Sequence, residues 1–152
     1  MPPELVEKDE MVLVGMVSND HDICGLWNRF MADEALVKHK VEGAGYELHI
    51  HPEGDNPWQG YTLMVGVQVT EVEDLPHEMF VKVLPACRYA VFTHKLSQGG
   101  YEGANAQMNG WLESGPYRLA RDLCIQVFDS RFKGGDHPDS EIDFLIPVVP
   151  KG

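Results

Sequence analysis

The order of the expected strands and helices repeats along the chain, and this repeat constrains the fold more than any single motif. The apolar run MVLVGMVS at residues 11–18 predicts a strand. A helix is expected next, because apolar side chains recur at helical spacing, and either Asp20 or Asp22 is suited to cap its N-terminus. The runs YELHIH at residues 46–51 and YTLMVGVQVT at residues 61–70 then predict two strands joined by a turn-rich loop. The apolar positions of the helix are Ile23, Leu26, Trp27, Phe30 and Met31.

The second half shows the same order, roughly 80 positions later, as is expected of an internal repeat. A strand is predicted at residues 87–94 (CRYAVFTH), followed by a helix that ends at Gly115-Pro116. Two more strands are predicted at residues 123–128 (LCIQVF) and 142–149 (IDFLIPVV), and a further strand at residues 79–84 joins the halves. The apolar face of the second helix holds Tyr101, Ala104, Met108, Trp111 and Leu112. The sequence therefore predicts an α+β fold of two tandem β-α-β-β modules with antiparallel sheets.

Two such modules have a physical consequence for binding. Each small sheet can bury one face under its own helix, while the other surfaces remain partly apolar. Packing of the modules about a pseudo-twofold axis would bring these surfaces together around a central cleft. A concave, mostly apolar cleft with a few polar groups is the usual form of a small-molecule site.

One strand carries an unusual residue toward this expected cleft. Side chains alternate along the strand at residues 123–128, so that Leu123, Ile125 and Val127 share one face and Cys124, Gln126 and Phe128 share the other. A neutral amide between a thiol and a phenyl ring is uncommon on a solvent-facing strand. Gln126 is therefore interpreted as a cleft residue, although a satisfied amide at the edge of the core is the alternative.

Composition narrows the classes of partner. The chain has 12 Lys and Arg against 24 Asp and Glu, and its net charge of −12 argues against binding to nucleic acid. No apolar run approaches the length of about 18 residues that a membrane span needs, and no secretory signal is visible. Three widely spaced cysteines, Cys24, Cys87 and Cys124, are typical of reduced thiols in a cytoplasmic protein.

Motifs of common cofactor and metal sites are not found in the sequence. His49 and His51 would share a strand face, but a metal site needs further ligands that the sequence does not supply nearby. No nucleophile elbow, Walker loop or HExxH motif is present. We therefore expect no metal and no cofactor.

Taken together, four segments resemble the GyrI-like family, the effector-binding domains found in AraC-type and MerR-type regulators and as free-standing proteins. The resemblance rests on LPACRYAVFTH (residues 84–94), WLESGPYRLA (111–120), CIQVFDSRF (124–132) and SEIDFLIPV (140–148) in this order. It implies one domain over residues 1–152, with repeats at about 10–70 and 79–149. It also implies two β-α-β-β modules with a ligand cleft between them.

The resemblance further implies a site for hydrophobic, often cationic or aromatic compounds, with a buried glutamate as the countercharge. In this chain Gln126 takes the place of that glutamate, and Phe128 takes the place of a tyrosine two residues later. An amide offers only hydrogen bonds, so the ligand is either neutral and polar or is paired with another acid. The candidate acids are Glu47, Glu113, Glu141 and Asp143.

Further ligand-binding residues are expected among the aromatic and methionine side chains of the predicted strands, helices and loops. Trp58 lies in a polar loop, where a role in the core is harder to arrange, whereas core packing is the default for Trp27 and Trp111. The full set of predicted ligand-binding residues is Gln126, Phe128, Trp111, Trp58, Tyr61, Tyr46, Met64 and Trp27.

Three functions are compatible with these observations. The first is a small-molecule binding module like the effector-binding domain of a transcription regulator, detached from a DNA-binding segment. It would act by sequestering its ligand or through a protein partner, and a homodimer is possible. The second is a hydrolase of reactive natural products, which some free-standing GyrI-like proteins resemble; Gln126 in the place of the usual acid weakens this hypothesis. The third is a protein-interaction module like the free-standing gyrase inhibitor. We expect the first function, multidrug binding included, with no catalytic residues.

Overall fold

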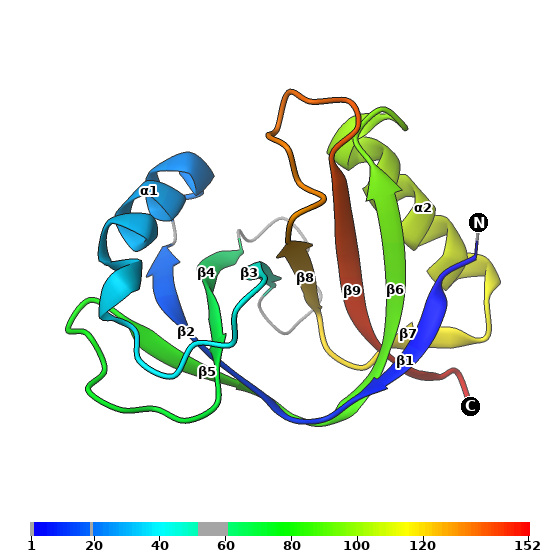
Figure 1. Ribbon diagram of the computed structural model, residues 1–152. Helices are drawn as coiled ribbons and strands as arrows, with labels where there is room; N and C mark the ends of the chain where they lie inside the picture. Colours follow the sequence, from blue (N-terminus) through cyan, green and yellow to red (C-terminus); the bar gives the residue numbers. More distant parts are fainter. Residues whose placement is uncertain (1, 19, 52–60) are drawn as a thin grey trace.

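The chain forms one curved antiparallel sheet with two helices (Figure 1). The computed structural model describes residues 2–18, 20–51 and 61–152. The strands are β1 (Glu4–Lys8), β2 (Met11–Ser18), β3 (Gly45–Ile50), β4 (Thr62–Val69), β5 (Phe80–Leu84), β6 (Cys87–Lys95), β7 (Tyr117–Leu119), β8 (Leu123–Phe128) and β9 (Glu141–Pro150). The helices are α1 (Ile23–Asp33), a short 3₁₀ turn at Glu34–Leu36, and α2 (Gly100–Ser114). The predicted α+β class is confirmed.

The strand order places the two β-α-β-β units side by side. It runs β1-β6-β9-β8-β3-β4-β2-β5, with β7 added at the end of β9. The first unit is β2-α1-β3-β4, the second contains β6, α2, β8 and β9, and the units meet where β3 pairs with β8. A central pairing between units makes one continuous sheet from the two halves.

The outermost strands exchange partners between the units. β1 precedes the first unit in sequence but pairs with β6 of the second, whereas β5 precedes the second unit but pairs with β2 of the first. Figure 1 shows the β1–β2 connection and the β5–β6 connection side by side at the bottom of the view. Strand β1 was not expected from the sequence, because its residues ELVEK are mostly charged and only Leu5 and Val6 suggest a strand. Strand β7 is three residues long and was also not expected.

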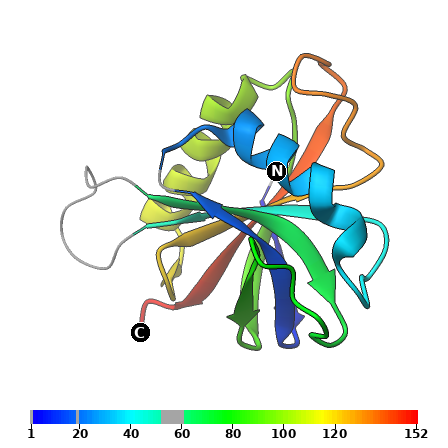
Figure 2. The ribbon, with the colours of Figure 1, turned by 90° about the vertical axis from the view of Figure 1, so that its left-hand side faces the viewer.

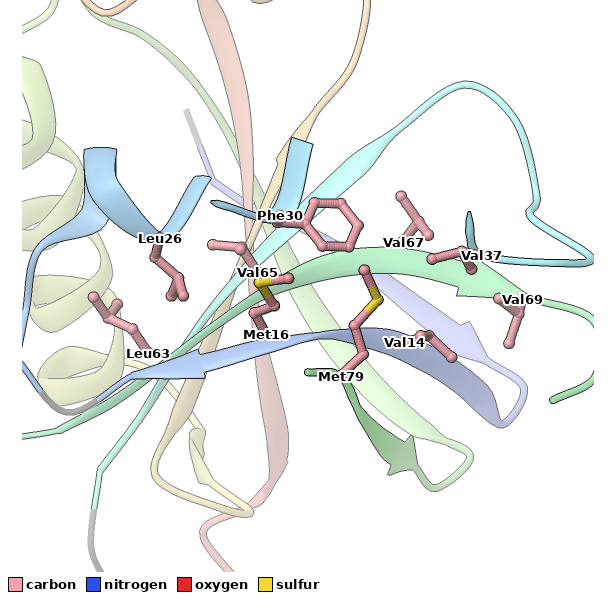
Figure 3. Packing of buried hydrophobic residues seen from close by; sticks show 10 residues of the cluster. All are labelled: Val14, Met16, Leu26, Phe30, Val37, Leu63, Val65, Val67, Val69 and Met79. Atoms are coloured by element: carbon pink, nitrogen blue, oxygen red, sulfur yellow. The ribbon is translucent and has the colours of Figure 1, made fainter. Parts of the chain in front are cut away.

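Both helices lie on the same face of the sheet (Figure 2). Helix α1 packs on β2 and β4 through Leu26 and Phe30, and Figure 3 shows these side chains against Met16 and Val65. Helix α2 packs on β6 and β9 through Ala104 and Met108. A third apolar cluster lies on the opposite face, where the curved sheet wraps around Leu13, Leu48, Met64, Tyr89 and Ile125. Alternation along each strand therefore supplies separate cores on the two faces of the sheet.

Local signals in the sequence explain the ends of the helices. Asp22 is the N-terminal cap of α1, since its Oδ1 accepts a hydrogen bond from the backbone N–H of Gly25 at 3.0 Å. Helix α2 ends at Gly115, whose N–H donates to the carbonyl of Trp111 at 2.8 Å. Met31 was expected on the buried face of α1, but its side chain is 64% exposed because it lies past the stripe that meets the sheet.

A pair of glycines allows β2 and β4 to approach closely. Gly15 and Gly66 are opposite each other in the ladder. A Cβ on Gly15 would lie 1.9 Å from the carbonyl oxygen of Val65, and one on Gly66 would lie 2.4 Å from that of Val14. No larger residue fits at this contact, which lies beneath α1.

In the described part of the chain, neither helix has the length and apolar character needed to cross a membrane.

Candidate ligand cavity

A cavity of about 650 Å³ lies between the two helices, over the centre of the sheet. Its size is within the range of about 300–1,000 Å³ that is usual for small-molecule sites. The lining comes from both units. The first unit contributes Ile23 and Cys24 of α1, Glu47 and His49 of β3, His51 after β3 and Tyr61 before β4. The second contributes Tyr101 and Asn105 of α2, Cys124 and Gln126 of β8, Gly135, and Phe144 of β9.

The floor of the cavity is the pairing between β3 and β8. Glu47 is opposite Gln126 in the antiparallel ladder, and His49 is opposite Cys124. Because side chains two residues apart share a face, all four point to the helix side of the sheet. Their neighbours Leu48 and Ile125 point to the opposite face and are completely buried there.

Glu47 is a buried acid with both oxygens hydrogen-bonded. The residue is 4% exposed. The indole Nε1–H of Trp27 donates to Oε1 at 2.8 Å, and Nε2 of His49 lies 2.7 Å from Oε2. These two contacts fix the orientation of the carboxylate, so the cavity floor holds an acid in a defined position.

Gln126 lies beside this charge and is 7% exposed. Its Nε2 is 3.2 Å from Nε2 of His49. Its Oε1 is buried and has no hydrogen-bond partner among the described residues. Such an atom is uncommon in a folded protein, where buried polar groups are nearly always paired.

Aromatic rings form one wall of the cavity. The ring of Tyr61 stacks on His21, with centroids 4.3 Å apart, and on His49, with centroids 5.0 Å apart. His51 lies tilted against the same tyrosine at 5.5 Å. Tyr101 and Phe144, whose rings meet edge to face at 6.4 Å, line another part of the cavity. Flat aromatic surfaces of this kind are suited to stacking on a ligand.

The charge of Glu47 also affects two neighbouring groups. Burial, with the charge of Glu47 added, raises the pKa of the Cys124 thiol to about 12. Burial and the charges of Glu47 and Cys24 raise the pKa of Tyr101. Both side chains therefore remain neutral at physiological pH.

The predicted ligand-binding residues are placed at different distances from this cavity. Gln126 and Tyr61 line it. Trp27 lies behind the lining, where it donates to Glu47 and meets Phe128 edge to face at 5.7 Å. Phe128 lines a separate hollow of about 320 Å³ near Gly45 and Val67.

Three other predicted residues are not in the lining. Tyr46 and Met64 point to the opposite face of the sheet, because each is one residue out of phase with the cavity-facing positions of its strand. Trp111, in the C-terminal half of α2, packs against Phe92 and Tyr117, and its ring is stacked on that of Tyr117 at 5.7 Å between centroids. Trp58 lies outside the described residues.

Of the four candidate acids, only Glu47 lines the cavity. Glu113 is exposed on α2. Asp143 accepts hydrogen bonds from Thr93 and Arg131, and Glu141 lies near Lys95 and Arg131.

Several lining residues were not proposed as ligand contacts from the sequence. His49 and His51 were considered only as metal ligands, and Tyr101 only as part of an apolar helix face. The polar alternation Glu47-x-His49-x-His51 in a strand was the signal that could have identified this face. Asn105 and Phe144 gave no such signal, because only the packing of α2 and β9 brings them to the cavity.

Known proteins match this chain in sequence and in fold. The family described as integron-associated effector binding protein matches residues 4–148. The transcriptional regulator BrlR of Pseudomonas aeruginosa is 29% identical over 155 residues; the match covers 97% of this chain and 56% of the regulator. The chain thus spans little more than half the length of that curated relative.

Three solved structures share the fold. SAV2435 bound to tetraphenylphosphonium superposes with a TM-score of 0.72 at 16% identity, over 98% of this chain and 94% of that one. The C-terminal domain of EcmrR has a TM-score of 0.72 at 14% identity, over 97% and 96% of the two chains. An integron cassette protein of Vibrio cholerae has a TM-score of 0.59 at 14% identity, over 98% and 97%.

Proposed function

The chain belongs to the family of integron-associated effector-binding proteins, and from this premise we propose that the cavity between α1 and α2 binds an organic cation with an aromatic or apolar body. It is homologous to the effector-binding part of a transcription regulator. The observation that carries the proposal is the buried carboxylate of Glu47 on the cavity floor.

Charge supports a cationic ligand over a neutral one. Glu47 is held by Trp27 and His49, and among the described residues no Lys or Arg lines the cavity. In a cavity of low dielectric, a negative charge attracts a cation by several kcal/mol at contact distance. The position on β8 that the family resemblance assigns to an acid is Gln126, and the carboxylate lies directly across the ladder from it.

The walls support an apolar body on the ligand. Tyr61, Tyr101 and Phe144 supply aromatic surface, and Ile23 supplies aliphatic surface. A ring stacked against a tyrosine contributes about 0.5–1.5 kcal/mol beyond the apolar area that it buries. The structural neighbour SAV2435 was solved with tetraphenylphosphonium, a cation of this chemical class.

The test is titration with tetraphenylphosphonium by isothermal calorimetry. Glu47→Gln keeps the shape of the side chain and its hydrogen bond from Trp27 but removes the charge. We expect its dissociation constant to rise at least about tenfold, because a buried charge pair contributes more than about 1.4 kcal/mol.

Glu113→Gln is the matched control, since it removes the same charge from the exposed surface of α2. Its affinity should equal that of the wild type at physiological ionic strength. Equal affinity of the wild type and Glu47→Gln would refute the role of Glu47, and equal losses in both variants would point to the net charge rather than to the cavity.

A further inference from the structure

The cavity floor lacks one hydrogen-bond partner, and the missing partner belongs to Gln126. The amide is more than nine-tenths buried, it lines the cavity, and its Oε1 has no partner among the described residues. A buried polar atom without a partner destabilises the empty site relative to one in which a ligand supplies the bond.

The neighbours of Gln126 cannot supply this bond. Nε2 of His49 lies 2.7 Å from Oε2 of Glu47 and 3.2 Å from Nε2 of Gln126. A ring nitrogen carries either one hydrogen or one lone pair, so it serves only one of these contacts well. The bond to the carboxylate is charge-assisted and therefore stronger. Whichever way the amide of Gln126 is turned, one of its polar atoms is left over.

The charge of Glu47 decides which chemical group completes the site. Glu47 and Gln126 are opposite each other in the ladder, so a ligand atom that reaches the amide is also close to the carboxylate. The carboxylate repels a hydrogen-bond acceptor and attracts a donor. The group that fits is a positively charged N–H, which donates a hydrogen bond to the carbonyl oxygen of Gln126.

We propose that Gln126 makes the cavity selective for cations that retain an N–H, such as protonated amines and amidines, over cations without one. This inference rests on the proposed function, because it assumes that a cation occupies the cavity beside Glu47. Glu47 attracts both kinds of cation by its charge, and Gln126 adds an acceptor that only a cation with an N–H can use.

The experiment uses 2-(1-naphthyl)ethylammonium and its N-methyl, N,N-dimethyl and N,N,N-trimethyl derivatives. All four are cations at neutral pH, and bulk grows by one methyl group at each step, but only the last step removes the last N–H. In calorimetric titrations of the wild type, we expect small changes over the first two methylations. The third should weaken binding at least about tenfold, as the loss of a hydrogen bond to a charged group implies.

Variants then identify the residue responsible. Gln126→Met keeps the length of the side chain without a carbonyl oxygen, so the drop at the third methylation should disappear. Asn109→Leu removes an amide from the exposed surface of α2, outside the cavity lining, and should leave the drop intact.

Each outcome bears on the inference. A third methylation that costs no more than the first two overturns it, and so does a drop that persists in Gln126→Met. If Gln126→Met does not fold, Gln126→Leu tests the same loss of the carbonyl oxygen. Binding of all four cations with equal affinity, weakened throughout by Glu47→Gln, would reject the selectivity and leave the proposed function standing. Absence of binding by any cation would reject both.

Discussion

Residue 126 explains why the sequence alone left the charge of the ligand open. The family resemblance implies an acid at residue 126, where this chain has an amide, and the carboxylate lies on the neighbouring strand at Glu47. Adjacent positions in an antiparallel ladder are only about 5 Å apart at Cβ and share a face. An acid on β3 in place of one on β8 therefore still lies within the same cavity.

The cysteines offer a test of this electrostatic environment. Cys24 is exposed at the start of α1, whereas the pKa of Cys124 is raised to about 12 by burial and by the charge of Glu47. Because the thiolate is the reactive form, a raised pKa slows alkylation at any pH below it. At pH 8 we expect iodoacetamide to modify Cys24 at least about tenfold faster than Cys124, as followed by peptide mass spectrometry.

Labelling of the unfolded chain is the control for that prediction. In guanidinium chloride the two cysteines should react at similar rates, because neither burial nor Glu47 then acts on Cys124. Rapid labelling of Cys124 in the folded protein would contradict the buried, negatively charged environment of the cavity floor.

At the scale of elements, β2 and β4 approach each other closely at one pair of residues. Both strands carry a glycine at the same rung, and the ladder there has no room for a Cβ. Helix α1 rests on the face formed by these two strands. Ile23 and Cys24 of the same helix line the cavity.

Substitution of these glycines should destabilise the fold. We expect Gly15→Ala and Gly66→Ala each to lower the free energy of unfolding by about 1–3 kcal/mol or more, because backbone atoms of the partner strand must move. Chemical denaturation followed by circular dichroism measures this change.

Gly110→Ala is the matched control, and its effect should have the opposite sign. This glycine lies on the exposed side of α2, where a Cβ would have open space within 4 Å. Alanine is the better helix former by up to about 1 kcal/mol. Stabilities of Gly15→Ala and Gly66→Ala at or above the wild-type value would show that the strands do not approach as closely as described.

At the scale of the molecule, the two units are joined in three places. β3 pairs with β8 at the centre, β1 of the N-terminal segment pairs with β6, and β5 pairs with β2. The cluster on the opposite face draws side chains from both units, including Leu13 and Leu145. Neither unit can separate without exposing this shared core.

The whole chain should therefore unfold in one cooperative transition. In a Trp58→Phe background, Trp27 reports on the first unit and Trp111 on the second. We therefore expect Trp27→Phe and Trp111→Phe in this background each to show coincident fluorescence and far-UV circular dichroism curves in denaturant. Two separate transitions would indicate that the repeats at about 10–70 and 79–149 fold independently. The prediction of one domain over residues 1–152 depends on this result.

The sequence by itself determined the principal strands, both helices and which residues of one strand share a face. These properties depend on local periodicity, and alternation in LCIQVF was sufficient to place Gln126 and Ile125 on opposite faces. Local periodicity failed where its signal was short or charged, as in β1 and β7.

Only the tertiary structure decided which residues meet. Glu47 was one of four candidate acids until the pairing of β3 with β8 brought it opposite Gln126. Tyr101, Asn105 and Phe144 entered the cavity through the packing of α2 and β9, and Trp27 became the donor to Glu47 through the packing of α1. Pairing between strands far apart in sequence depends on the free energy of the whole packed sheet, which no local pattern encodes.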